Sequence, residues 1–347
     1  MNQALSAVGI SASELTLTDS EAHSDVGKSL FTAFAKITAQ APKSLQEPSR
    51  AHFAKCGKLL RGQLAFAAAR IYGSPADSAA LWAASVELLH NASLVHDDLC
   101  DKDSIRRGQR TVYRQYGAAV AVCLGDYYIA KAFELGAHAG VASVPHLSSS
   151  ISTLVGGQAA EFTHAGYPDW SHYEQIAAHK TAPLLSLGVI GAAAINDRSA
   201  PVERIERYFY HAALCFQMIN DFRNFSGSDG AESPCSDLAN CRPNAVIACF
   251  TETLPLQLSA RFSLWADKIK SGEIIADAVE TREWWQRLCA SGAFSDAAQR
   301  LHFHFNMATT ELTQLPSALQ GVVTSLNEWL ALELTKTQHC MSQKRDR

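Results

Sequence analysis

The sequence predicts an all-α protein, and three observations support this expectation. The chain has 347 residues, of which 47% are hydrophobic, so it can bury a sizeable core. Apolar residues recur at helical spacing over long segments, among them 81–96, 118–135 and 144–162. The sequence lacks the short alternating segments, separated by turn residues, that a β-rich fold would need. We therefore expect a single helical domain over residues 26–335.

The N-terminal part should alternate between loose segments and helices. Residues 1–25 are polar and rich in Ser and Thr, which predicts a flexible arm. Residues 26–37 are amphipathic and predict the first helix. Pro42 and Pro48 indicate a linker, after which a second helix is expected over residues 52–71.

The remaining chain should continue as helices interrupted by one long loop. Further helices are expected over residues 81–96, 118–135, 144–162, 171–194 and 204–222. Residues 226–244 are rich in Gly, Ser, Pro and Asp, which predicts a loop, and loops of this length are often lids. Several amphipathic helices follow over 245–334, and residues 336–347 form a basic tail.

Composition excludes several classes of function. The net charge of −4 gives no general attraction to nucleic acid. The nine cysteines are scattered and form no CxxC pair, so reduced thiols in a cytoplasmic protein are the simplest account. No uninterrupted apolar stretch predicts a transmembrane helix, and the Ala- and Gly-rich segment 184–195 indicates a buried helix instead.

Acidic residues gather where the helix predicted over 81–96 ends. Asp97 and Asp101 are four residues apart, so their carboxylates leave one helix face about one turn apart, whereas Asp98 points elsewhere. Two carboxylates aimed at one point repel each other unless a cation lies between them. Mg²⁺ suits such oxygen ligands and commonly uses one or two carboxylates plus substrate phosphates. A solvated acidic turn is the simpler interpretation of this short motif alone.

Basic residues nearby favour the metal-binding interpretation. Arg106 and Arg107 follow within ten residues, and guanidinium groups are suited to bidentate phosphate binding. Lys58 and Arg61 share one helix face between two glycines, which favours close approach of the backbone to another group. Acid, metal ion and arginine together indicate a diphosphate site.

These motifs resemble those of the trans-isoprenyl diphosphate synthases, also called the polyprenyl synthetase family, over residues 26–334. Residues 57–61 are similar to the family's GGKRxRP motif, and residues 90–107 to its HxxxLxHDDxxD…RRG block. The family's GD, GQ, KT and FQ pairs stand in order at 125–126, 157–158, 180–181 and 216–217. Each motif is short, but their order and spacing as a set are specific.

The resemblance implies an isoprenoid-synthase-type helical bundle around a central cavity, assembled as a homodimer. It implies that two Asp-rich motifs face each other and hold two or three Mg²⁺ ions bridged by diphosphate. The metal positions it implies are Asp97, Asp101, Asn220, Asp221 and Asn224. The catalytic groups it implies are Asp97, Asp98, Asp101, Arg106 and Lys180.

The resemblance also implies how prenyl diphosphate substrates are bound. Arg106 and Lys180, with Thr181, are expected to bind the allylic diphosphate. The residues expected to bind the diphosphate of isopentenyl diphosphate are Lys58, Arg61, His90 and Arg107. Gln217 and Arg242 are further expected substrate contacts, because they stand at substrate-binding positions of the family's motifs.

The second Asp-rich motif departs from the family's DDxxD, and three activities compete. Asn220 and Asn224 replace two acids, so this motif should hold metal less tightly. The activities are condensation with isopentenyl diphosphate, cyclisation as in a terpene synthase, and prenyl transfer to another acceptor. The retained second basic cluster favours condensation, because a cyclase binds one diphosphate only. A non-catalytic partner subunit would typically lose the first motif, which this chain keeps.

Product length depends on the residues one turn before the first Asp. In the family these positions form the cavity floor, and here they are the small residues Ala92 and Ser93. An open floor predicts a product longer than farnesyl, such as geranylgeranyl, within the farnesyl or geranylgeranyl range expected of the activity. The alternative is that an aromatic residue of the next predicted helix closes the cavity, namely Tyr127, Tyr128 or Phe133.

Overall fold

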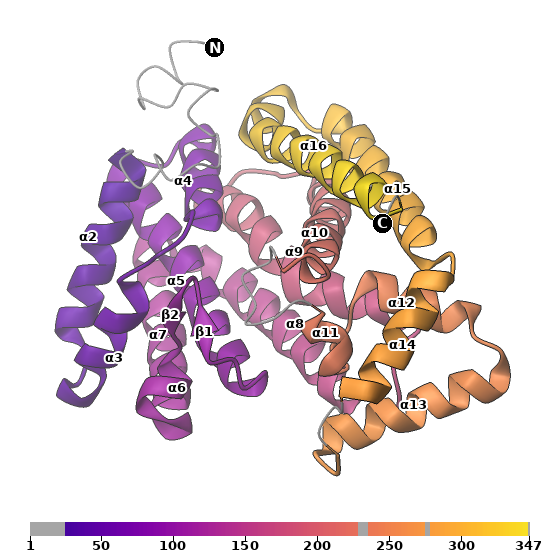
Figure 1. Cartoon of the computed structure of the whole chain (residues 1–347). Helices are drawn as coiled ribbons and strands as arrows, with labels where there is room; N and C mark the ends of the chain where they lie inside the picture. The colour runs from indigo at the N-terminus through magenta and orange to yellow at the C-terminus, as the bar shows by residue number, and fades with distance from the viewer. Residues whose placement is uncertain (1–24, 228–234, 275–277, 346–347) are drawn as a thin grey trace. The chain divides into compact units, whose positions relative to one another are not determined.

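The computed structural model describes residues 25–227, 235–274 and 278–345, and it confirms the all-α prediction (Figure 1). The strands within these ranges are β1 (Ile105–Arg106) and β2 (Gln109–Arg110), which pair antiparallel as a hairpin. The arm predicted over residues 1–25 lies outside the described residues except for Asp25, where the first described helix begins.

The described chain divides into two compact units. Unit 1 takes its residues from three stretches, namely those up to 152, 183–207 and 311–329. Unit 2 takes its residues from 153–182, 208–310 and from 330 onward. The single domain expected over residues 26–335 stays a prediction, because the chain divides into these two units.

The helices follow one another with short connections. The first half of the chain forms α2 (Asp25–Gln40), α3 (Lys43–Phe53), α4 (Leu60–Tyr72), α5 (Ala76–Cys100), α6 (Val112–Tyr116), α7 (Ala118–Ala139), the 3₁₀ turn η2 (Val141–Ser143) and α8 (Val144–Thr163). The second half forms α9 (Trp170–Ile195), α10 (Val202–Asn224), α11 (Ser236–Ala239), α12 (Ala245–Thr253), α13 (Leu256–Ser271), α14 (Ala278–Ala290), α15 (Ala293–Gln314) and α16 (Ser317–Arg345). Helix α16 therefore includes most of the predicted basic tail.

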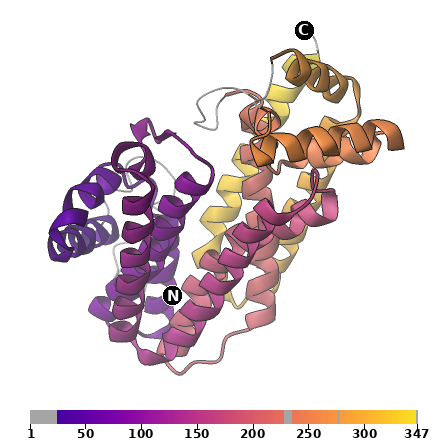
Figure 2. The same ribbon diagram turned by 90° about the horizontal axis from the view of Figure 1, so that it is seen from below.

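Helix α5 is the core helix of unit 1, and it packs along α4 and α7 (Figure 1, Figure 2). Most of its residues from Trp82 to Val95 are buried, including polar ones such as Glu87 and Asn91, because neighbouring helices cover α5 on several sides. Gly125 of α7 allows the close approach, since a Cβ atom there would lie 2.1 Å from Nε2 of His96. Trp82 adds a hydrogen bond from its indole N–H to the carbonyl of Gly188 at 2.9 Å. Contacts near both ends of α5 therefore hold this helix in place within unit 1.

Two expectations for the N-terminal part are wrong. The predicted linker is α3, which begins after Pro42 and contains the buried Pro48 in its interior, although proline there removes one backbone hydrogen bond of the helix. The helix expected over 52–71 is interrupted between α3 and α4. Gly57 and Leu59 adopt left-handed conformations there, with φ of 73° and 52°, which no α-helix can include.

The later helices confirm the sequence prediction with two qualifications. The loop expected over 226–244 contains the short helix α11, and residues 228–234 lie outside the described residues. Helix α9 is long and apolar enough to cross a membrane by length and composition, with a mean hydropathy of 1.3 over its most apolar window. Because 72% of that window is buried within the structure, α9 is weak evidence for a membrane span.

Candidate functional site

The first acidic motif lies at the C-terminal end of α5. The backbone N–H of Asp101 donates to the carbonyl of Asp97 at 2.8 Å, and Asp101 keeps helical dihedral angles as the C-cap. The predicted one-turn spacing of the two residues is therefore realised, and both are partly exposed. The two carboxylates together offer the hard oxygen ligands that Mg²⁺ prefers.

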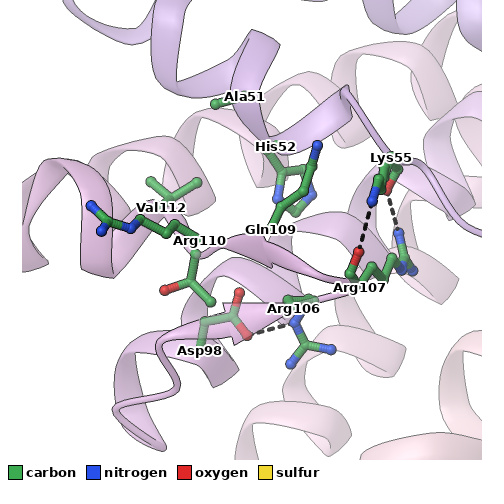
Figure 3. A pocket seen from close by; sticks show the side chains of 10 residues that line it. Ala51, His52, Lys55, Asp98, Arg106, Arg107, Gln109, Arg110 and Val112 are labelled. Atoms are coloured by element: carbon green, nitrogen blue, oxygen red, sulfur yellow. Dashed lines mark hydrogen bonds and ion pairs between the residues drawn. The ribbon is translucent and has the colours of Figure 1, made fainter. Parts of the chain in front are cut away.

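Asp98, between them, has a different environment. Its side chain is only 2% exposed, and Nε of Arg106 donates to its Oδ1 at 2.5 Å (Figure 3). Burial raises the pKa of Asp98 to about 6, while the neighbouring Arg106 opposes that rise. Asp98 therefore holds the guanidinium of Arg106 in position.

Arg107 occupies the turn of the β1–β2 hairpin. Arg107 and Gly108 have φ of 53° and 73°, the left-handed conformations that two-residue hairpins of type I′ require. For Arg107 this conformation costs about 1–2 kcal/mol. Its guanidinium donates to the carbonyl of Lys55 at 3.0 Å and packs on Gly57, where a Cβ would lie 2.5 Å from Cζ of Arg107. The close approach expected at Gly57 is therefore to this arginine.

The other predicted basic residues form a cluster with α5. Arg61 and His90 share a hydrogen bond of 3.1 Å between Nη1 and Nε2. Burial lowers the pKa of His90 well below its usual value, and the nearby Arg61 lowers it further, so the imidazole is neutral. The Nε atom of Arg61 is buried and has no hydrogen-bond partner among the described residues. Lys58 has its Nζ atom 5.0 Å from the ring centroid of Trp329.

Glu87 belongs to this cluster, although sequence analysis does not single it out. Its side chain is buried, and Oε2 accepts the backbone N–H of Gly62 at 2.8 Å. Burial raises the pKa of Glu87, while Gly62 and Arg61 oppose the rise. The sequence could have indicated this role of Glu87, because an acidic residue inside an apolar helical segment needs a polar partner when it is buried.

A pocket opens beside the hairpin, with about 320 Å³ of space that includes open solvent (Figure 3). Its lining comes from the end of α3 and the residues just after it, from the end of α5, from the hairpin and from the start of α6. It includes Lys55, Arg106, Arg107 and Arg110. His52 also lines it and shares a 2.9 Å hydrogen bond with Asn91. Burial lowers the pKa of His52 to about 4, so this ring is neutral near pH 7. The positive charge of the pocket therefore comes from the lysine and the arginines.

In unit 2, Lys180 forms an ion pair with Glu161 across α8 and α9. Gly157 makes this contact possible, because a Cβ there would lie 2.7 Å from Cβ of His179. Thr181 is buried next to Lys180. Both polar atoms of the Gln158 side chain are buried without a hydrogen-bond partner among the described residues. Glu161 and Gln158 are two further candidates that sequence analysis left unassigned.

The second Asp-rich motif lies at the C-terminal end of α10, and its one acidic residue, Asp221, is buried and hydrogen-bonded. Asp221 is 2% exposed and accepts three hydrogen bonds, from Tyr173 at 2.6 Å, from Gln217 at 2.9 Å and from the N–H of Ala245 at 2.8 Å. Burial raises the pKa of Asp221 to about 7, although the hydrogen bonds from Tyr173, Ala245 and Gln217 lower it. The carboxylate thus fixes the amide of Gln217.

The flanking asparagines differ from each other. Asn224 is buried, donates to Oγ of Ser236 at 2.7 Å and accepts the N–H of Asp237 at 3.1 Å, so it joins α10 to α11. Asn220 is partly exposed. In this conformation Asn220 is therefore the member of the motif best suited to meet an ion.

The loop after α10 is tied back to the same motif. Asn244 donates to the carbonyl of Asp221 at 3.2 Å and to Oδ2 of Asp237 at 2.9 Å, and it caps α12. Arg242, an expected substrate contact, is partly exposed, and its carbonyl accepts the hydroxyl of Tyr167 at 2.6 Å. These bonds hold the backbone of the loop against α10.

The donor groups fit Mg²⁺ bound together with a diphosphate. Among the described residues no group of three or more His, Cys, Asp or Glu side chains could hold a metal ion. Mg²⁺ usually keeps few protein ligands and takes oxygens from substrate phosphates, so the pair Asp97 and Asp101 is sufficient on the protein side.

The predicted residues lie in both units, with Asp97, Arg106 and the Arg61 cluster in unit 1. Unit 2 holds Lys180, Thr181, Gln217, Asn220, Asp221, Asn224 and Arg242.

Comparisons with known proteins agree with this chemistry. A family model described as polyprenyl synthetase matches residues 42–272. A chloroplastic geranylgeranyl pyrophosphate synthase of Capsicum annuum is 35% identical over 207 residues, which cover 55% of this chain and 56% of that protein. A (2E,6E)-farnesyl diphosphate synthase of Mycobacterium bovis is 36% identical over 180 residues, which cover 50% of each chain. The chain thus spans about half the length of the curated relatives it matches.

Solved structures share the fold. A decaprenyl diphosphate synthase from Rhodobacter capsulatus has a TM-score of 0.77 and 19% identity, and the match covers 94% of this chain and 99% of that one. A geranylgeranyl pyrophosphate synthetase from Pyrococcus horikoshii Ot3 has a TM-score of 0.74 and 23% identity, over 88% and 95% of the two chains. At such identities the likeness shows the fold alone.

Proposed function

Because this chain belongs to the polyprenyl synthetase family, we propose that it is a Mg²⁺-dependent prenyltransferase that condenses an allylic prenyl diphosphate with isopentenyl diphosphate. The observation that carries this proposal is the cluster between α4 and α5, in which Arg61 of α4 pairs with the neutral His90 of α5, seven residues before Asp97. A cluster of this kind is suited to a second diphosphate, which condensation needs and cyclisation does not.

The chain's own cations supply much of the proposed chemistry. When the allylic C–O bond breaks, negative charge builds up on the diphosphate, and Arg106 and Lys180 are proposed to stabilise it. Each is held by a carboxylate, Asp98 or Glu161. Mg²⁺ bound at Asp97 and Asp101 would add charge neutralisation of the leaving group.

Arg61 is proposed to bind the diphosphate of isopentenyl diphosphate. Its unpartnered Nε leaves a donor for that ligand, and Glu87 holds the adjacent backbone through Gly62. The double bond of the bound isopentenyl diphosphate then attacks the allylic carbon, a carbon–carbon bond forms, and the departing diphosphate takes the released proton. No protein base is required for that step.

Cyclisation is the second candidate, because the second motif departs at Asn220 and Asn224 from the DDxxD that condensing members of the family carry. Asn220 in place of an acid would weaken one metal position, as discussed above. Incubation with farnesyl diphosphate and Mg²⁺, first alone and then with isopentenyl diphosphate, separates the candidates. Condensation predicts an elongated product that requires the second substrate. Diphosphate release from the allylic substrate alone would establish a cyclase or hydrolase, and the absence of turnover with any allylic substrate would favour a non-catalytic subunit.

Asn220→Asp should lower the Mg²⁺ concentration for half-maximal activity by about tenfold, because a charged carboxylate binds Mg²⁺ more tightly than a neutral amide. Titration of steady-state activity with Mg²⁺ measures the effect. Asn224→Asp is the matched control, because the buried Asn224 would lose its donor to Ser236 and gain no access to an ion. An unchanged Mg²⁺ requirement in Asn220→Asp would exclude this position from metal binding.

Ala92→Phe should shorten the product, because a larger side chain would raise the proposed cavity floor. Ala92 is buried. The hydroxyls of Tyr127 and Tyr128, two residues of the alternative floor, donate hydrogen bonds to the carbonyl of Ile37 in α2 and to Oγ of Ser49 in α3. Chromatography of the prenyl products measures the effect, and the series Val, Leu, Phe at position 92 should shorten them stepwise. The larger side chains should also cost about 1–3 kcal/mol of stability. Full-length products from a folded Ala92→Phe chain would contradict the assignment.

Location and assembly are further proposals. We propose a cytoplasmic protein, because the nine cysteines are scattered along the sequence without a CxxC pair, as is common for reduced thiols. We also propose a homodimer, as the family resemblance implies. The exposed Val122 of α7 and Val141 after it are apolar residues that such an interface could cover.

A further inference from the structure

Lys58 differs from Arg106 and Lys180 of the proposed site in the partner that holds it. Arg106 is paired with Asp98, and Lys180 is paired with Glu161. No carboxylate within the described part of the chain pairs with Lys58. Its Nζ atom lies instead 5.0 Å from the ring centroid of Trp329, a distance typical of a cation–π interaction.

The backbone around Lys58 is already fixed. Its carbonyl accepts the amide of Gln63 at 3.0 Å, and the next residue, Leu59, is buried in a left-handed conformation. The preceding Gly57 lies against the guanidinium of Arg107. The remaining freedom is therefore in the long side chain of Lys58 itself, which is exposed.

An indole face restrains this side chain without neutralising it. A carboxylate beside Lys58 would cancel its charge and compete with an incoming diphosphate, whereas the quadrupole of the ring attracts the ammonium and adds no net charge. The full positive charge of Lys58 thus stays available to a ligand. Trp329 and Lys58 belong to the same compact unit, although they are distant in sequence.

We propose that Trp329 of α16 is a positioning residue that orients the ammonium of Lys58 toward the diphosphate of isopentenyl diphosphate. This inference rests on the proposed function and deepens it. Trp329 does not touch the reacting atoms. It restricts the conformations of the Lys58 side chain before the ligand binds, so less conformational entropy is lost on binding.

The test measures the Kd of isopentenyl diphosphate by calorimetry, and its KM during elongation. Trp329→Leu should raise both by about two- to fivefold, the size of a cation–π interaction at an exposed site. The KM of the allylic substrate and kcat should change by less than about twofold. Trp329→Phe should keep most of the affinity, because it retains an aromatic face. Leu332→Ala, an exposed position on the same helix, is the matched control and should leave all of these values unchanged.

A double-mutant cycle isolates the pair. In a Lys58→Met background, Trp329→Leu should have no further effect on isopentenyl diphosphate binding. An unchanged Kd in Trp329→Leu, an equal rise for both substrates, or the same rise in the Lys58→Met background would overturn the inference. Wild-type chain that binds isopentenyl diphosphate without elongating it would refute condensation alone. Wild-type chain that does not bind it would refute both proposals.

Discussion

Asp97→Ala and Asp101→Ala should each reduce kcat for prenyl transfer by about a thousandfold, because a metal ligand at the leaving diphosphate supplies several kcal/mol and each 1.4 kcal/mol is tenfold in rate. Both residues are partly exposed at the end of α5, so their loss should leave the fold intact. Steady-state kinetics at saturating Mg²⁺ and a thermal melt measure the two effects separately.

The control for that experiment lies on the same helix. Asp77 stands in the first turn of α5 and is exposed, so Asp77→Ala makes the same charge change at the opposite end and should keep full activity. Asp98→Ala should behave differently from both, because the partly buried Arg106 would lose its partner. We expect it to lower stability as well as activity. Near-normal kcat in Asp97→Ala or Asp101→Ala would contradict the proposed metal site.

Asp221→Ala should lower the free energy of unfolding by about 3 kcal/mol or more, because three donors, two of them buried, would lose their acceptor. These donors are the hydroxyl of Tyr173, the amide of Gln217 and the N–H of Ala245. Denaturant unfolding measures the loss. Asn220→Ala is the matched control on the same helix, and as a partly exposed position it should change stability by less than about 1 kcal/mol.

The pH dependence of Asp221 gives a second measurement on the same residue. Burial raises the pKa of Asp221 from 3.8 to about 7, so the folded chain keeps a proton that the unfolded chain has lost. The contribution of Asp221 to stability should therefore fall as pH rises from about 4 to about 7, by about 4 kcal/mol in total. Asp221→Asn does not titrate, so its stability relative to wild type should rise over that interval. A constant difference between the two chains would show that Asp221 is ionised throughout.

Local sequence patterns predicted most of the helices and one part of the site. The apolar periodicity of residues 81–96 places a buried helix there, and the four-residue spacing places Asp97 and Asp101 one turn apart at its end. Both follow from the geometry of a single helix, which needs no knowledge of its neighbours. The order of the motifs also needs no knowledge of packing, because it is a property of the linear sequence, and it identifies the family.

Long-range packing decided which charged groups are paired, and the sequence could not predict it. Asp97 and Asp98 are adjacent identical residues, yet only Asp98 is buried against Arg106. The second motif likewise turns Asp221 inward to Tyr173, which is 48 residues away along the chain.

The break between α3 and α4 has the same kind of cause. Leu59 is buried in its left-handed conformation, and the guanidinium of Arg107 lies against the left-handed Gly57, where a side chain would not fit. A sequence determines its helices through neighbours within one or two turns. The desolvation and pairing of each charge depend instead on residues that only the folded chain brings together.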